Sequence, residues 1–194
     1  MNHSPHCRAC KERVRELLTA IFGPCRLNHS LPWSAHPADY ANSTIGDALA
    51  RVHVALTAFR DHRDFIKSAM MPPCDYFMPD PVFILEFDES QHFSAARLVT
   101  LANYPGNIPL GFSIERWQEL CREIDAKDDE PFDRDERRAW YDTLRDLLPI
   151  MHGFKPTVRL YAEEFEWCNL KAGSAGDVDR FRRLLRDRLP SGTR

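Results

Sequence analysis

Residues 74–92 contain the feature that most constrains the fold of this chain, a predicted β-hairpin with acidic residues at the open end of both arms. Asp75 begins the first arm, and Glu86 and Asp88 end the second. Between them, residues 79–81 (Pro-Asp-Pro) are typical of a turn, because proline pre-sets backbone dihedral angles. Carboxylates that meet at one sheet edge raise one another's pKa unless a cation or a shared proton is present. The first hypothesis is therefore a divalent-metal site.

The register of this hairpin decides whether the carboxylates meet. In a tight antiparallel pair centred on Asp80, Asp75 lies opposite either Leu85 or Glu86. Side chains alternate between the two faces of a strand, so Glu86 and Asp88 point to one face and Leu85 points to the other. The register that pairs Asp75 with Glu86 would bring the three carboxylates to one surface.

Carboxylate oxygens in this number suit Mg²⁺ or Mn²⁺, and Mg²⁺ binds through one or two carboxylates together with a substrate phosphate. Such an ion supports phosphodiester hydrolysis, because it polarises the phosphoryl group and lowers the pKa of an attacking water. His92 follows Asp88 closely and could act as an acid or base or contact a phosphate. Ser94 begins the next predicted helix, with Arg97 one turn on, and both are candidate phosphate contacts.

These residues also have a purely structural explanation. Asp75 could cap the end of a strand, and Glu86 and Asp88 could be hydrated at a sheet edge. Gln91 and His92 could satisfy the hydrogen bonds of a turn. The spacing of the residues leaves both the metal site and this alternative open.

Residues 85–92 (Leu-Glu-Phe-Asp-Glu-Ser-Gln-His), followed by Arg97, resemble the signature of PD-(D/E)XK restriction-endonuclease-like nucleases. The similarity is to the branch that contains very-short-patch-repair endonucleases, whose members place an aspartate at the position of Asp75. A later strand with an arginine completes the pattern. The resemblance covers residues 70–104 well and residues 155–170 weakly.

This resemblance implies an α/β fold with a mixed, restriction-endonuclease-like sheet flanked by helices. It also implies an endonuclease that hydrolyses DNA in defence or repair and depends on Mg²⁺ or Mn²⁺, with Asp75 and Glu86 as metal ligands. The catalytic residues that it implies are Asp75, Glu86, Asp88 and His92, and the substrate-binding residues are Gln91, Ser94 and Arg97.

The sequence departs from the family pattern at two positions. Glu89 stands in place of a glycine, and the lysine of the superfamily would fall at Asp88. The role of that lysine would pass to His92, to a lysine from elsewhere such as Lys67, or to no residue. The alternative function is therefore a catalytically inactive, nuclease-like scaffold that binds protein or nucleic acid.

A chain of 194 residues is expected to form a single domain. Within it, hydrophobic periodicity predicts a helix from about residue 43 to Lys67. The charged run at 125–138 is expected to be a solvated loop and first helical turn. The expected parts are a Cys/His-containing helix in 1–30, a nuclease-like core in 43–104 and 155–170, a helical insertion in 105–154 and a basic C-terminal helix in 177–190.

Two of these parts are candidate binding surfaces. The insertion has no counterpart in the minimal nuclease fold, and a protein partner or a second copy of the chain could bind there. The C-terminal helix carries arginines on one face, which could contact phosphates or could be solvated.

Cysteine and histidine spacing near the N-terminus indicates a second candidate metal site. Cys7, Cys10, Cys25 and His29 have the number and spacing of a tetrahedral zinc site. A single Cys-x-x-Cys is a weak motif, however, and the first helix could dock without metal. A zinc-stabilised binding module is therefore a further reading of the function.

Charge and hydropathy limit the partners and the location. The net charge of −3 excludes a strongly basic nucleic-acid coat, so DNA would have to bind at a local patch. The apolar runs are short and the first residues do not resemble a secretion signal, so we expect no membrane segment and a cytoplasmic location. Six cysteines in such a chain are expected to be reduced thiols or metal ligands.

Overall fold

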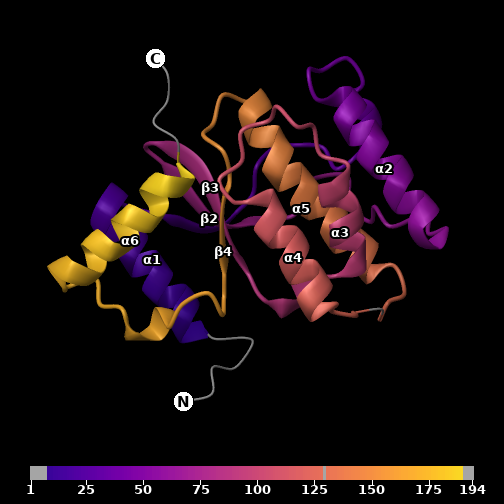
Figure 1. Ribbon diagram of the computed structural model, residues 1–194. Helices are drawn as coiled ribbons and strands as arrows, with labels where there is room; N and C mark the ends of the chain where they lie inside the picture. The colour runs from indigo at the N-terminus through magenta and orange to yellow at the C-terminus, as the bar shows by residue number, and fades with distance from the viewer. Residues whose placement is uncertain (1–7, 129, 190–194) are drawn as a thin grey trace.

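The computed structural model describes residues 8–128 and 130–189 and has an α/β fold, in which a four-stranded mixed sheet lies between two groups of helices (Figure 1). The strands are β1 (Arg26–His29), β2 (Cys74–Pro79), β3 (Val82–Asp88) and β4 (Val158–Tyr161), in that order across the sheet. β1, β2 and β3 pair antiparallel, whereas β3 and β4 pair parallel. The predicted mixed sheet flanked by helices is thus confirmed, and its restriction-endonuclease type stays a prediction.

Helices cover both faces of the sheet, and in chain order they are α1 (Arg8–Phe22), α2 (Gly46–Arg60), α3 (Ala95–Ala102), α4 (Ile114–Ile124), α5 (Arg134–Met151) and α6 (Ala175–Arg188). Figure 1 shows α1 and α6 on one face and the other four helices on the opposite face. Short 3-10 turns are η1 (Pro37–Tyr40), η2 (Ser90–His92) and η3 (Trp167–Asn169). Within the described ranges, no helix is long and apolar enough to cross a membrane.

Side chains of the hairpin alternate between two hydrophobic cores. Tyr76 and Leu85 pack on the side of α1 and α6, whereas Phe77 and Ile84 pack on the side of α2 and α5, as the period of a strand requires. The α1-side core includes Val14, Leu17, Leu18, Tyr76, Leu85, Phe87, Trp167 and Phe181, and the α5-side core includes Leu49, Val52, Leu56, Phe77, Ile84, Trp140, Leu144 and Leu148.

The hairpin adopts the register that brings acidic residues together. Tyr76 pairs with Leu85, so the next step of the ladder places Asp75 opposite Glu86. Glu86 and Asp88 point to the α5 side because Leu85 and Phe87 point to the other core. Of the two registers that the sequence leaves open, the structure has the one that places Asp75 opposite Glu86.

Two elements differ from the sequence predictions. The second helix ends at Arg60 and not near Lys67, because Asp61 adopts a left-handed conformation (φ 56°) that closes the helix. Strand β1 was not predicted, because its sequence (Arg-Leu-Asn-His) is largely polar and exposed. Its backbone pairs with the edge of β2, and pairing of this kind leaves little trace in side-chain patterns.

The charged run at 125–138 is only partly solvated, and the prediction was wrong for its second half. Asp133, Asp135 and Glu136 at the start of α5 are at most 2% exposed. Nearby cations surround these acids, including Lys67 with its Nζ 3.0 Å from Asp133 Oδ2. These acids lie on the side of α5 that packs into the molecule, whereas Arg134 beside them is exposed.

Candidate active site

Asp75 and Glu86 are fixed to each other at the open end of the hairpin. The backbone N–H of Asp75 donates to Glu86 Oε1 at 3.2 Å, and the backbone N–H of Phe87 donates to Asp75 Oδ2 at 3.0 Å. Glu86 is 4% exposed, whereas 29% of the Asp75 side chain reaches solvent. One carboxylate of the pair is therefore buried, and the other is open to the surface.

Burial changes the charge state of Glu86. Desolvation raises the pKa of Glu86 to about 8, against the opposing effect of Arg145, and the charge of Asp75 raises it further. Arg145 on α5 places its Nε 3.5 Å from Glu86 Oε1. Near neutral pH the Glu86 carboxyl therefore holds a proton, which an additional cation at the site would displace.

A lysine does reach this pair, and it comes from α1. Lys11 Nζ lies 3.7 Å from Asp75 Oδ1 and 3.7 Å from Glu89 Oε1. Lys67, which was a candidate for this role, instead pairs with Asp133 and Asp64. Lys11 was missed because it is remote from the hairpin in sequence and lies on a helix with an ordinary amphipathic pattern.

A surface pocket of about 190 Å³ opens beside Asp75 and Lys11. Its wall combines cationic, acidic and amide side chains from α1, β1 and β2. The lining residues are Arg8, Lys11, Glu12, Leu27, Asn28, Asp75 and Tyr76. The pocket gives a ligand in solvent access to the Asp75 carboxylate.

Asp88 has a different position from the one predicted, because it is 1% exposed and both of its oxygens are occupied. Arg159 Nη1 donates to Asp88 Oδ1 at 2.7 Å, and the indole N–H of Trp117 donates to Asp88 Oδ2 at 2.8 Å. In this arrangement Asp88 neutralises Arg159 and does not face an open metal site.

Arg159 is the centre of a buried group of ion pairs, which we call the Arg159 network: Asp88, His92, Arg97, Asp142, Asp146 and Arg159. Arg159 Nε donates to Asp146 Oδ1 at 2.7 Å, and its Nη2 lies 3.3 Å from Asp142 Oδ1. Arg159 lies on β4 opposite Glu86, and the two aspartates come from α5. The network therefore joins the sheet to the helix that covers it.

Arg97 also belongs to this network and does not face a substrate. It is 1% exposed, and its Nη2 donates to Asp146 Oδ2 at 2.6 Å. Its Nη1 donates to Tyr104 Oη at 2.7 Å, and the Tyr104 hydroxyl donates in turn to Asp146 Oδ2 at 2.8 Å. The prediction that Arg97 contacts phosphate is contradicted by this burial.

His92 lies at the edge of the Arg159 network. Its Nδ1 is 2.9 Å from Asp142 Oδ2 and 3.7 Å from Asp88 Oδ1, and 20% of its side chain is exposed. Burial opposes the imidazolium, but the two aspartates outweigh it and raise the pKa of His92. A protonated His92 thus compensates one of the buried aspartates.

Ser94 and Gln91 are occupied by local hydrogen bonds. Ser94 is 2% exposed, and its Oγ accepts from the backbone N–H of Arg97, which is the predicted helix cap and not an open phosphate contact. Gln91 Nε2 donates to Glu89 Oε2 at 2.8 Å, and the Gln91 carbonyl accepts from Arg138. Both residues support the turn that leads from β3 into α3.

The described members of the predicted zinc site are not gathered. Cys10 Sγ lies 2.7 Å from Cys168 Sγ, while Cys25 Sγ lies 3.9 Å from the carbonyl oxygen of Arg26. The His29 ring packs on Phe77 with their centroids 4.4 Å apart, and Cys7 lies outside the described residues. Across residues 8–128 and 130–189, no group of three or more His, Cys, Asp or Glu side chains could hold a metal ion.

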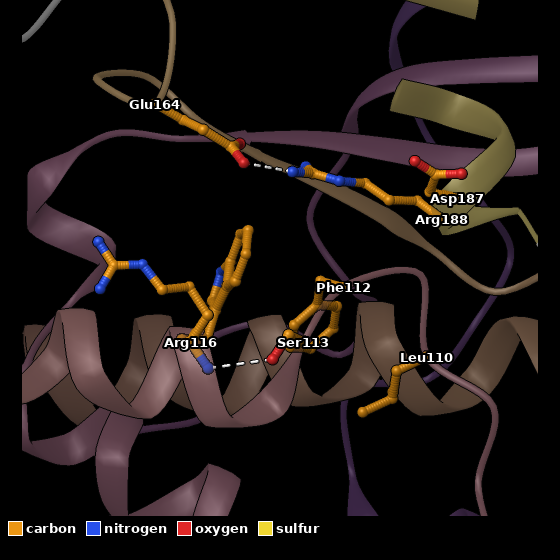
Figure 2. A pocket seen from close by; sticks show the side chains of 8 residues that line it. Leu110, Phe112, Ser113, Arg116, Glu164, Asp187 and Arg188 are labelled. Carbon is orange, nitrogen blue, oxygen red and sulfur yellow. Dashed lines mark hydrogen bonds and ion pairs between the residues drawn. The ribbon is translucent and has the colours of Figure 1, made fainter. Parts of the chain in front are cut away.

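A second pocket, of about 370 Å³, lies between α4, the segment after β4 and the end of α6 (Figure 2). Trp117 forms part of its wall and links it to the Arg159 network through Asp88. Arg188 pairs with Glu164 at this pocket, as Figure 2 shows. Arg116 pairs with two glutamates of its own helix. The arginines of this pocket are therefore already neutralised.

Comparison with protein-family models, with characterised proteins and with solved structures finds no match to this chain. The resemblance to PD-(D/E)XK nucleases stays a prediction from the motif.

Proposed function

We propose that the protein is a metal-dependent endonuclease that hydrolyses phosphodiester bonds in DNA, with its site at Asp75 and Glu86. The observation that carries this proposal is the facing pair of acidic residues on β2 and β3, one buried and one partly exposed, with Lys11 beside them. The order of acidic residues along the hairpin, which resembles the nuclease signature, supports it.

Asp75 and Glu86 fit a Mg²⁺ or Mn²⁺ ion that takes its other ligands from water and phosphate, since Mg²⁺ commonly binds through one or two carboxylates. The raised pKa of Glu86 agrees with this, because the carboxyl would exchange its proton for the metal. When bound, such an ion polarises a phosphoryl oxygen and lowers the pKa of water. Because Arg145 already compensates Glu86 in part, we expect weak binding in the absence of substrate.

The cations of the pocket would bind the substrate. Arg8 and Lys11 line the surface next to Asp75, where they would attract the phosphates of a DNA strand. Lys11 Nζ would also stabilise the negative charge that develops on the reacting phosphate, because it is the lysine closest to the exposed carboxylate among those described. The net charge of −3 requires DNA to bind at a local basic patch, and Arg8 and Lys11 would provide one.

The test is cleavage of plasmid and of single- and double-stranded oligonucleotides with Mg²⁺ or Mn²⁺. Asp75→Asn should reduce cleavage at least about 100-fold, since even residues that only orient metal ligands cost roughly 10- to 100-fold. Asp80→Asn is the matched control, because it makes the same change at the exposed turn of the same hairpin. If both Asp75→Asn and Glu86→Gln cleaved DNA as well as the wild type, the active site would not be at Asp75 and Glu86.

The Arg159 network favours a second candidate, a scaffold with a nuclease-like sheet and no catalysis. Asp88 and Arg97 are bound inside this network, so two residues of the implied site are unavailable to substrate. Binding of Mn²⁺, measured by electron paramagnetic resonance, separates the two functions. A scaffold would show no Mn²⁺ signal dependent on Asp75 and no cleavage of any substrate.

A further inference from the structure

Cys10 and Cys168 meet in the structure although 158 positions separate them in the sequence. Their Sγ atoms are 2.7 Å apart, well inside the separation of two sulfur atoms in ordinary contact. Cys10 lies on α1 and Cys168 lies in η3, and both elements pack in the α1-side core through residues such as Leu17 and Trp167. Packing of the two elements therefore holds the sulfurs within reach of each other.

We propose that Cys10 and Cys168 are a redox-active pair that closes to a disulfide when the protein meets a peroxide. A disulfide needs two side chains already placed by the fold, and the packing of α1 on η3 supplies that placement. In a protein without a dense disulfide framework, such a bond is expected to be reversible and not structural. Closure of this pair requires no nuclease activity.

The exposure of the two thiols sets the order of the reaction. Cys10 is 2% exposed, whereas Cys168 is half-buried, so we assign the first reaction with peroxide to Cys168, the more accessible residue of the two. The Cys168 thiol loses its proton, and its thiolate attacks one oxygen of hydrogen peroxide; the O–O bond breaks, a sulfenic acid forms, and the leaving hydroxide takes up the proton and departs as water. The Cys10 sulfur then attacks the sulfenic sulfur, the S–S bond forms, the S–O bond breaks and a second water leaves.

The sum of these steps is two thiols and one hydrogen peroxide giving one disulfide and two waters. A dithiol reductant reverses it by thiol–disulfide exchange. The bond would join α1 to the segment after β4, and so would restrain the helix that presents Lys11 next to Cys10. The oxidised protein should therefore unfold at a higher temperature than the reduced protein.

The experiment uses the full chain, first reduced and then treated with hydrogen peroxide, alkylated and digested for mass spectrometry. We expect a peptide that links Cys10 to Cys168 and that disappears after reduction. Cys121→Ser is the control, because Cys121 is buried in a different cluster and its loss should leave the link intact. A link from Cys10 to Cys7 or Cys25 in its place would overturn the proposal.

Two variants test the order of the steps. Cys10→Ser should leave a sulfenic acid on Cys168 that dimedone labels, while Cys168→Ser should leave Cys10 with at most a tenth of that labelling. Equal labelling of the two variants would overturn the assignment of Cys168 as the first site.

The melting temperatures of oxidised and reduced wild type test whether the disulfide restrains α1, and this comparison needs no variant. An unchanged melting temperature after complete oxidation would show that the bond does not restrain α1. Zinc bound to the purified protein and protecting both thiols would replace the redox pair with a metal site.

Discussion

Three buried acids converge on Arg159. Its guanidinium contacts Asp88, Asp142 and Asp146, and no part of it reaches solvent. A guanidinium stays charged even when buried, because its pKa is far above neutrality and the surrounding carboxylates raise it further. Arg159 therefore keeps its charge inside the protein, where it pairs with these three side chains.

Removal of Arg159 should destabilise the fold strongly. Arg159→Met leaves buried carboxylates without their cation, which typically costs about 3 to 5 kcal/mol of the free energy of unfolding. Urea denaturation measures the loss. Arg182→Met is the control, since its ion pair with Asp179 is exposed on α6 and should contribute less than about 1 kcal/mol. Similar values for the two variants would mean that the network does not hold α5 to the sheet.

Glu86 should give the protein a specific dependence on pH. Its pKa is raised from 4.5 to about 8, so between these values the folded protein holds a proton that the unfolded chain has released. The free energy of unfolding should therefore fall as the pH rises through this window, by at most about 1.4 kcal/mol per pH unit, and level off above pH 8. Urea denaturation of wild type and Glu86→Gln over this range measures it, because the amide does not titrate. A wild-type-minus-variant difference that is constant with pH would contradict the proton on Glu86.

At the scale of elements, α5 decides which charges are buried. Asp142, Arg145 and Asp146 lie on α5 at helical spacing and so face the sheet together. Residues 139–149 of this helix are buried all round, and charged groups at this depth must find partners. The sequence of α5 mixes tryptophan, leucine and charged residues. This pattern could not predict that α5 is buried, because an amphipathic helix at the surface has the same mixture.

The cap of α3 is a second feature at this scale, and its contribution to the free energy of unfolding can be measured. Ser94→Ala removes the hydrogen bond to the backbone N–H of Arg97, which should lower the free energy of unfolding by about 1 kcal/mol. Ser113→Ala removes the equivalent cap from α4 and is the matched control, with a similar loss. Chemical denaturation gives both values. If Ser94→Ala also abolished DNA cleavage at unchanged stability, Ser94 would have a role beyond the cap.

At the scale of the whole molecule, the sheet separates two cores, and the candidate site lies at one end of its two central strands, β2 and β3. Asp75 and Glu86 come from the hairpin, Arg145 from the α5 side and Lys11 from the α1 side. The site is thus assembled from elements that meet only in the complete fold. Its ligand should therefore stabilise the molecule as a whole.

Mn²⁺ should raise the melting temperature if it binds at Asp75 and Glu86. At a concentration of 100 times the dissociation constant, a ligand of the folded state adds about 2.7 kcal/mol to the free energy of unfolding. Differential scanning fluorimetry of wild type, Asp75→Asn and the control Asp80→Asn measures the shift. We expect a shift in wild type and in the control, and none in Asp75→Asn. An equal shift in all three proteins would indicate adventitious binding elsewhere.

Local patterns gave correct predictions where neighbours in sequence determine the structure. The turn at 79–81, the alternation of Glu86 and Leu85 and the cap at Ser94 follow from dihedral preferences and strand or helix periods. Predictions failed where distant elements decide the environment, as for the burial of Arg97 and of Asp135. Both residues look solvated in sequence because charged side chains usually are.

The amino-acid sequence alone determined the hairpin and limited it to two registers, with Asp75 opposite either Glu86 or Leu85. It could do so because side chains in β structure alternate with a period of two residues. Only the tertiary structure decided which cation each acid receives: Arg159 for Asp88, Arg145 for Glu86 and Lys11 for Asp75. The physical reason is that the strength of an ion pair depends on distance and burial, and both are set by packing between elements remote in the chain.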